Sequence, residues 1–318
     1  MSHVARFVVV FKQLLFEAIH LRPTPLVSAG QAATLVLAER DELMRALPGA
    51  MERMSEVTSL LSGLQGGLGH SLVALALVRG VEPTTLPPRV DLIRGRFTEH
   101  GIPRKGLWPE IAAGWLALEP DAVVDQALPR IAAVMAAWKQ DHPWLTGHDD
   151  LHAAVLHALG TAPVRDVRRL TEDRYIALKA AGFTWAPNTL QRAAQLAALY
   201  PEISAGDVGR RFRTLRDELR FAGKPASGAE REAVVLLACT DTSEAQLAAD
   251  YTAALRQLDD SGLGQFCDAR NRGVLAAGLV AADHFSDRRV AVQGMTLAAI
   301  VAAIHTAMAA EIVNPPMG

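Results

Sequence analysis

Side chains that could bind a metal ion or transfer protons are concentrated in one short stretch of the sequence: His142, His148, Asp149, Asp150, His152 and His157. Neutral imidazole and carboxylate groups are common metal ligands, and two of these histidines have the i, i+4 spacing of zinc-binding helices. The glutamate that follows the first histidine in zinc-dependent proteases is absent, because an aspartate stands there. His157 would also point away from the other two histidines on a helix. One helix could not bring all three to a single ion.

The same stretch also contains the signals of a helix start. Thr146 followed by Asp149 has the spacing of a capping box, in which two polar side chains satisfy the first free N–H groups of a helix. Apolar residues then recur at i, i+3, i+4, i+7 and i+8 from Leu151 to Leu159, which predicts one packing face. We therefore interpret this stretch as a helix cap with histidines on the surface. No metal ion and no other cofactor is expected.

Three further patterns have a chemical and a structural interpretation. A glycine-rich turn before a helix can bind phosphate, but Gly63, Gly66, Gly67 and Gly69 lack a preceding strand and a following Lys-Ser or Lys-Thr. Arginines cluster between Arg210 and Arg220, yet interleaved acidic residues predict i, i+4 ion pairs on a solvated helix face rather than a surface for nucleic acid. Cys239 and Cys267 show no paired histidine, so both are expected to be structural.

The composition describes a globular protein without a marked charge. The 318 residues carry a net charge of -2, which provides no general attraction to nucleic acid or acidic lipid. Two cysteines form no disulfide framework, so a reduced, cytoplasmic location is expected. Arginine outnumbers lysine 27 to 5, which we attribute to the coding bias of a GC-rich genome. Residues 290–310 carry no formal charge, but their alanines and polar residues favour a buried helix over a membrane span.

A repeat of about forty residues organises most of the chain. Apolar helix ends recur with separations of 41, 41, 40, 40 and 40 residues, at Leu77, Leu118, Leu159, Leu199, Cys239 and Leu279. Each closes an alanine-rich segment that we interpret as the second helix of a hairpin. A first, amphipathic helix is expected upstream of each, at residues 51–61, 90–97, 131–138, 174–180, 212–219 and 251–258.

The elbows between the two helices of a hairpin carry stop and start signals. Gly101, Gly182, Gly223 and Gly262 stand just past the first helix, where a left-handed backbone conformation ends a helix without a steric penalty. Starts follow at capping-box spacings, which are Asn188 with Gln191 and Ser227 with Glu230 in addition to the Thr146 pair.

These signals predict an all-α protein that forms a single domain over residues 1–318. The expected order is N-terminal helices in residues 1–48, six antiparallel hairpins in residues 49–289 and a C-terminal apolar helix in residues 290–312. Such hairpins stack either as an open α/α superhelix, a solenoid, or as a closed (α/α)6-type toroid, and the sequence pattern is the same for both. Whether the first and last hairpins touch distinguishes these two arrangements.

A family resemblance supports the helical fold. The pattern of Pro143, Trp144, Thr146 and Asp150, followed by Gly182-Phe183 and Leu190-Gln191, resembles a bacterial family of uncharacterised all-helical proteins catalogued as a domain of unknown function. The motifs that carry the resemblance lie in the middle third of the chain. The resemblance implies a helical fold and no catalytic assignment.

Function is expected at the elbows. Trp144 and Trp185 stand 41 residues apart in equivalent elbows, and we interpret each ring as filling its own corner, with stacking on a ligand as the alternative. The candidate residues of a rim or pocket are Trp144, His148, Asp149, Asp150, His152 and Trp185. The leading hypothesis is an interaction scaffold for a protein or peptide. The alternative is an enzyme or small-molecule-binding protein with a central pocket. Homo-oligomers through the C-terminal apolar helix are a further expectation, and nucleic acid is not an expected partner.

Overall fold

The computed structural model describes residues 1–17, 25–58, 67–184, 186–224, 229–265 and 269–285, and these residues form helices and connecting turns without a strand. The all-α class is therefore confirmed. The expected C-terminal helix at 290–312 lies outside the described residues. Among the helices that are described, none combines the length and apolar character needed to cross a membrane.

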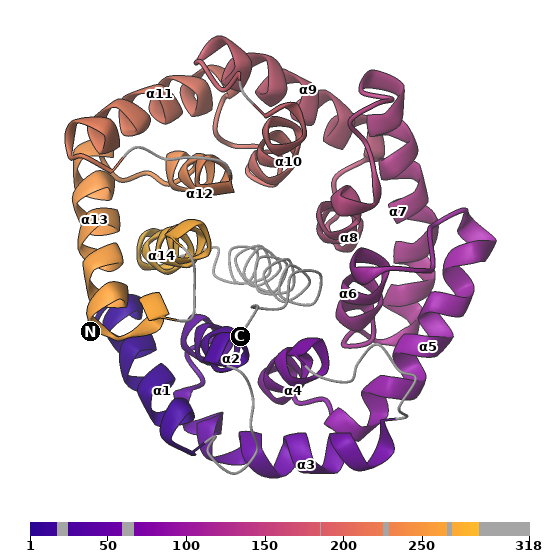
Figure 1. The fold of residues 1–318 in the computed structure, drawn as a ribbon. Helices are drawn as coiled ribbons and strands as arrows, with labels where there is room; N and C mark the ends of the chain where they lie inside the picture. The colour runs from indigo at the N-terminus through magenta and orange to yellow at the C-terminus, as the bar shows by residue number, and fades with distance from the viewer. Residues whose placement is uncertain (18–24, 59–66, 185, 225–228, 266–268, 286–318) are drawn as a thin grey trace, which may run out of the picture.

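The α-helices lie in two layers, one around the other (Figure 1). The odd-numbered helices form the outer layer: α1 (His3–Glu17), α3 (Leu47–Val57), α5 (Leu86–Phe97), α7 (Asp121–Asp141), α9 (Val164–Ala180), α11 (Ala205–Phe221) and α13 (Glu244–Asp260). The even-numbered helices form the inner layer: α2 (Pro25–Leu37), α4 (Gly67–Arg79), α6 (Leu107–Leu116), α8 (Leu151–Leu159), α10 (Pro187–Ala197), α12 (Ala229–Ala238) and α14 (Ala269–His284).

Short 3-10 helices connect or extend these elements. They are η1 (Asp41–Ala46), η2 (Pro83–Thr85), η3 (Thr98–His100), η4 (His148–Asp150) and η5 (Leu263–Gln265). Every segment expected to be a first helix overlaps an outer helix, and every segment expected to be a second helix overlaps an inner one. For Leu151–Leu159 the expected and observed bounds are the same. The two helices α1 and α2 form a further pair that precedes the six expected hairpins.

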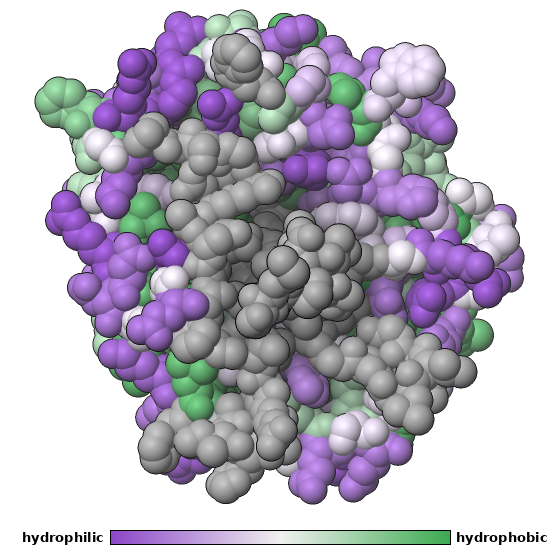
Figure 2. Space-filling view, viewed as in Figure 1, coloured by the Kyte–Doolittle hydropathy of each residue, from purple (hydrophilic) through white to green (hydrophobic). Residues whose placement is uncertain are grey.

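The two layers differ in how their side chains are buried. The outer helix α11 buries Val208, Phe212, Leu215 and Leu219 along one face and leaves charged residues outside. The inner helix α14 is buried at every position from Gly273 to Ala282, which is more than two full turns. Hydrophilic side chains accordingly surround the periphery of the molecule in Figure 2. Helix α11 is therefore amphipathic, whereas α14 is covered almost all round.

The first described helix packs against the last ones. Helix α1 contacts both α13 and α14, and α14 also contacts α2. The backbone N–H of His3 donates to Asp283 Oδ1 at 3.1 Å, and the His3 ring is hydrogen-bonded to the same carboxylate. Residues 280 positions apart in the sequence thus meet.

The turn chemistry of the elbows is as predicted at four glycines. Gly101, Gly182, Gly223 and Gly262 have φ values of 68°, 95°, 73° and 87°. An added Cβ at Gly182 would lie 2.5 Å from Arg216 Nη1, so the end of the arginine side chain would have to move. The capping box predicted for Asn188 is wrong, since α10 begins at Pro187 and Ala186 precedes it without a side-chain cap. The Ser227 pair lies outside the described residues.

Two glycine substitutions are expected to change stability in opposite directions. A Cβ added at Gly209 in α11 would lie 2.8 Å from the backbone oxygen of Ala177 in α9, so Gly209→Ala forces the two helices apart. We expect Gly209→Ala to lower the free energy of unfolding by about 1–3 kcal/mol despite the better helix propensity of alanine. Gly95→Ala, in α5 with nothing within 4 Å, should raise it by about 0.5–1 kcal/mol. Urea denaturation of both variants measures the difference, and a stabilising Gly209→Ala would contradict close packing of α9 on α11.

Candidate functional site

The elbow before α8 is tied to the two following inner helices by a polar network. Arg192 in α10 donates from Nη1 to Asp149 Oδ2 at 2.6 Å, and its Nε lies 3.4 Å from Glu232 Oε2 of α12. Gln191 Nε2 donates to Thr146 Oγ1 at 2.8 Å. The network is partly buried and joins residues about forty positions apart. The network therefore links the start of α8 to α10, and α10 to α12.

Asp150 is the most deeply buried carboxylate of the elbow, with 1% of its surface exposed. Its Oδ2 accepts a hydrogen bond of 2.7 Å from the N–H of Gly147, so Asp150 caps this turn. The capping box predicted for Thr146 and Asp149 is therefore wrong, because those side chains bind α10 instead. Burial, with a smaller contribution from the charge of Asp149, raises the pKa of Asp150 to about 6, against the opposing effects of Gly147, Gln195 and Arg192.

The histidines of α8 are part of the interior. His152 Nδ1 is hydrogen-bonded to the backbone oxygen of Asp149 at 2.7 Å, and its ring stacks on Trp108 with centroids 5.2 Å apart. His157 Nε2 donates to the backbone oxygen of Gln195 at 2.8 Å. Burial lowers the pKa of both histidines to about 4, so both are neutral at pH 7. The prediction of surface histidines is correct for His148 and wrong for these two.

Two buried amide side chains of α10 have polar atoms that lack hydrogen-bond partners among the described residues. Gln191 and Gln195 are 1% and 0% exposed. Within the described residues, Gln191 Oε1 and both polar atoms of Gln195 have no hydrogen-bond partner of good geometry. The Gln195 amide is nevertheless close enough to Asp150 to favour the charged form of its carboxylate. Buried amides usually have partners, so these groups require an explanation.

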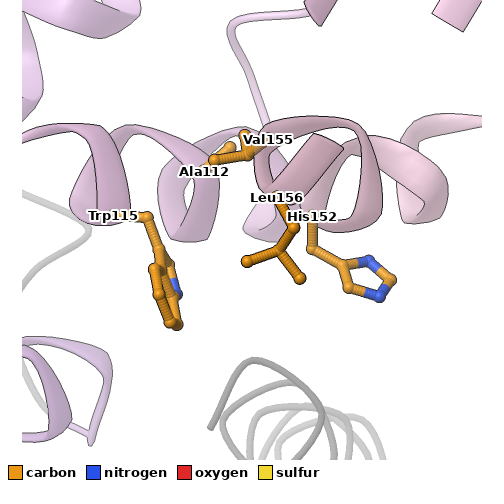
Figure 3. A pocket seen from close by; sticks show the side chains of 5 residues that line it. All are labelled: Ala112, Trp115, His152, Val155 and Leu156. Atoms are coloured by element: carbon orange, nitrogen blue, oxygen red, sulfur yellow. The ribbon is translucent and has the colours of Figure 1, made fainter. Parts of the chain in front are cut away.

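A hollow next to His152 is too small to hold a substrate. It is lined by Ala112, Trp115, His152, Val155 and Leu156 and contains about 170 Å³ of empty space, in which a water-sized sphere finds no room. Figure 3 shows Trp115, Leu156 and His152 extending from the same side of α6 and α8. The hollow therefore brings a histidine among apolar side chains without giving a reactant access to it.

Trp144 lies apart from this interior. Its side chain is 94% exposed, so the interpretation that it fills its own elbow is wrong. Beside it in the chain, the His142 ring packs on Tyr175 with centroids 4.2 Å apart, and His142 Nε2 is 2.8 Å from Glu172 Oε2. Trp185, its expected counterpart, lies outside the described residues.

Few of the described residues could support metal binding or thiol chemistry. In the described part of the chain, no group of three or more histidine, cysteine, aspartate or glutamate side chains is placed to hold a metal ion. Cys239 is buried, and burial raises the pKa of its thiol to about 12, which suits a structural residue. Cys267 lies outside the described residues.

Sequence reasoning missed the partners that other repeats contribute. Glu110, Asp150, Gln191 and Glu232 are separated by 40, 41 and 41 residues, and each lies at or near the first turn of an inner helix. The repeat spacing was the signal that could have grouped them. The candidate residues come instead from the elbow before α8, with Trp185 from the next one, and they leave out Arg192, Gln195 and Glu232.

Comparison with known proteins identifies the family of the chain. Residues 112–311 match the family described as "Protein of unknown function (DUF4003)". The chain belongs to this family. The resemblance seen in the middle third is thereby confirmed, and the DUF4003 match extends it toward the C-terminus. Searches of curated proteins and of solved structures found no match.

The DUF4003 match contains the whole polar network. Asp149, Asp150, Gln191, Arg192 and Glu232 all lie within residues 112–311. Helices α1 to α5 precede the matched residues, so the contact of α1 with α14 joins a helix outside the match to one inside it.

Proposed function

We propose that this DUF4003 protein is a non-enzymatic interaction module of the cytoplasm that binds a protein or peptide. In this proposal its hairpin repeats form a closed α/α toroid, and the partner binds at the elbow rim, defined as the turns that lead from each outer helix to the next inner helix. Trp144 is the anchor of that rim.

The closed arrangement is supported by the contacts between the two ends of the described chain. An open superhelix leaves its first and last hairpins apart, whereas α1 packs on α13 and α14 and is hydrogen-bonded through His3 to Asp283. Closure removes the long concave groove on which a solenoid binds its partners. Binding at the rim is then the better alternative.

The observation that carries the proposal is the exposure of Trp144. A tryptophan exposed to 94% gains much from being covered, and tryptophan is enriched among residues that dominate binding energy. The turn that carries Trp144 also has a polar pair, because His142, two residues earlier in the chain, lies 2.8 Å from Glu172 Oε2 of α9. An exposed apolar anchor on a turn with a polar pair suits a peptide that inserts one large apolar side chain beside polar ones.

A peptide library tests this proposal. Peptides selected on the wild-type protein should lose affinity for Trp144→Ala by at least about tenfold, as expected for a central aromatic anchor. Leu92→Ala is the matched control, because Leu92 is 65% exposed in the middle of the outer helix α5 and therefore lies outside the elbow rim. Fluorescence anisotropy gives the dissociation constants. Selection of no peptide above background, or equal affinity for Trp144→Ala, would overturn the proposal.

The alternative function is an enzyme or small-molecule-binding protein with a central pocket. It is favoured by Asp150, a buried acid whose pKa of about 6 suits proton transfer near neutral pH. The small hollow beside His152 does not provide its substrate site, because no reactant fits there. Trp144 is therefore the better guide to function.

A further inference from the structure

The backbone of the elbow before α8 is held at both of its ends by hydrogen bonds. Gly147 pairs with Asp150 in both directions: its N–H donates to Asp150 Oδ2 at 2.7 Å, and its carbonyl oxygen accepts from the N–H of Asp150 at 3.3 Å. At the other end, the N–H groups of Leu145 and Thr146 donate to the backbone oxygen of His142. Trp144 lies between these two sets of bonds. A weaker bond between Asp150 and Gly147 therefore loosens the segment that carries Trp144.

Asp150 and Gln195 form a buried pair in which the amide suits either protonation state of the acid. Their exposed fractions are 1% and 0%. A primary amide contains an N–H donor group and a carbonyl acceptor, and rotation about its last side-chain bond exchanges the two. The charged carboxylate needs donors, which the N–H of Gly147 and the Gln195 amide provide. The protonated acid needs an acceptor, and Gln195 Oε1 has no other partner of good geometry in the part of the chain that the structure describes.

The nearest charges compensate the charge of Asp150 only in part. Asp149 on the same turn carries a like charge and pairs with Arg192 of α10. The guanidinium of Arg192 also lies 3.4 Å from Glu232, so two other carboxylates share it. Burial is the largest effect and raises the pKa of Asp150 to about 6, and the charge of Asp149 acts in the same direction. Asp150 therefore takes up its proton under mildly acidic conditions.

The other titratable groups at the facing ends of α6, α7 and α8 have their own environments. They are His148 and Lys139, which are exposed; His152, which burial keeps neutral; Glu110, which lies 3.5 Å from Arg94; Asp141, which accepts from Arg168; and His142, which lies 2.8 Å from Glu172. Glu110 is the second buried acid of this region, and burial raises its pKa as well. Of all these groups, only Asp150 accepts a hydrogen bond from the N–H of Gly147.

We propose that Asp150 and Gln195 form a proton switch that controls how the elbow before α8 presents Trp144 to its partner. With Asp150 charged, the carboxylate holds the N–H of Gly147 and the elbow has the described conformation. As the pH falls, Asp150 takes up a proton, donates its O–H to Gln195 Oε1 and accepts only a weaker, neutral hydrogen bond from Gly147. The elbow is then held less firmly, and binding at Trp144 weakens. The proposal rests on the proposed function, because the switch regulates the same rim.

NMR titration of the full chain between pH 8 and pH 5 tests the switch without a partner. In the wild type, the backbone N–H of Gly147, the side-chain amide of Gln195 and the indole N–H of Trp144 should shift together, with a midpoint near pH 6. Asp150→Asn is the matched variant, because its amide keeps an acceptor for Gly147 and a donor for Gln195 but does not titrate. The three signals should not move in this variant. Absence of the shifts in the wild type, or the same shifts in Asp150→Asn, would overturn the proposal.

Binding measurements distinguish the switch from the rim itself. Peptides selected at pH 7.5 from a library without acidic residues and histidine should bind the wild type about fivefold more weakly at pH 5, within the usual range of coupling between two sites. Asp150→Asn should show the weaker affinity at both pH values. Asp125→Asn is the control for loss of a carboxylate, because Asp125 is exposed on α7 and pairs with Arg96, and it should behave as the wild type.

The two experiments fail in different ways. If no peptide binds at Trp144, the proposed function is wrong, and the NMR titration alone decides whether Asp150 controls the elbow. If peptides bind the wild type equally at both pH values, Trp144 remains the anchor of the rim and only the switch is refuted.

Discussion

Replacing Arg174 by methionine is expected to lower the free energy of unfolding by about 3–5 kcal/mol, because the change leaves several buried carbonyl groups without a donor. Arg174 lies in α9 and is 1% exposed. Its Nε donates to the backbone oxygen of Ala197 at 2.9 Å, and its Nη2 donates to those of Tyr200 and Ile203 at 2.8 and 2.7 Å. These oxygens lie at and just beyond the C-terminal end of α10. Methionine fills the space of the side chain but provides no N–H group.

Chemical denaturation of matched variants measures this effect. Arg169→Met is the control on the same helix, because Arg169 pairs only with Asp166 and Asp173 in the described structure and its side chain is 62% exposed. It should change stability by less than about 0.5 kcal/mol. Arg174→Lys should recover only part of the loss, since one ammonium group cannot reach three acceptors with the geometry of a guanidinium. Equal stabilities of the Arg174→Met and Arg169→Met proteins would show that the carbonyls find other donors.

Arginines of two other outer helices also donate hydrogen bonds to backbone oxygens at the C-terminal end of an inner helix. Arg130 of α7 donates to the backbone oxygens of His157, Ala158 and Ala162, at and after the end of α8. Arg211 of α11 donates to those of Ala238 and Thr242 around the end of α12. An outer helix thus caps the C-terminal end of its own inner helix with a cation, which also interacts favourably with the helix dipole. Coding bias alone therefore does not account for the arginine content.

The arginines between Arg210 and Arg220 only partly follow the prediction made for them. Arg210 pairs with Asp207 on its own helix, as expected for a solvated face. Arg213 and Arg216 instead donate to the backbone oxygens of Ala180 and Ala181 at the end of α9. A charge pattern along one helix shows which residues can pair within it. It does not show the acceptors that a neighbouring helix presents.

Local patterns predicted the helices well because helix burial is set by spacing along the chain. The apolar positions of Leu151–Leu159 and the glycine of each elbow depend on neighbours within a few residues. Caps were predicted less well. The side-chain N-caps of the described helices include Ser204, which accepts from the N–H of Asp207, and Ser243, which accepts from that of Gln246, both at the starts of outer helices. The pairing of α1 and α2 and the contact between His3 and Asp283 depend on residues far apart, which periodicity does not relate.

The sequence predicted where the candidate site lies, but it did not predict which side chains surround it or how deeply it is buried. Asp150 and His152 were selected from their types and spacing, and both belong to the buried elbow before α8. A helical wheel assumes one exposed face, which inner helices of this fold lack. The wheel therefore placed the two deepest histidines on the surface. Arg192 and Gln195, which complete their surroundings, come from the next hairpin.

His157→Gln is expected to make the protein markedly more resistant to acid. The pKa of His157 is about 4 in the folded chain, against about 6.5 when unfolded, because burial disfavours the charged ring. Below pH 6.5 the unfolded chain binds a proton that the folded chain refuses, so stability is complete above pH 6.5 and falls as the pH approaches 4. Each such histidine removes about 3 kcal/mol over this interval, and His152 behaves in the same way.

Protonation of Asp150 has the opposite effect on stability, so its contribution must be distinguished from that of the histidines. Its pKa of about 6 lies above the 3.8 of an ordinary aspartate, so the folded chain binds the proton first and gains stability as the pH falls from 6 toward 4. Asp150 is unchanged in both proteins, so the difference between wild type and variant isolates His157. Glutamine keeps an N–H group that can donate to Gln195, and this group does not titrate.

Urea denaturation between pH 7 and pH 4 measures the expected difference. The stability lost by the wild type over this range should exceed that lost by His157→Gln by about 3 kcal/mol, with the two curves diverging below pH 6.5. His148→Gln is the control, because the His148 side chain is exposed on the same elbow and its replacement should leave the pH profile unchanged. Parallel profiles for wild type and His157→Gln would mean that His157 is protonated within the folded protein. Its hydrogen bond to Gln195 and its burial beside Trp138 would then have to be rearranged at low pH, since a charged imidazole needs an acceptor for both ring nitrogens.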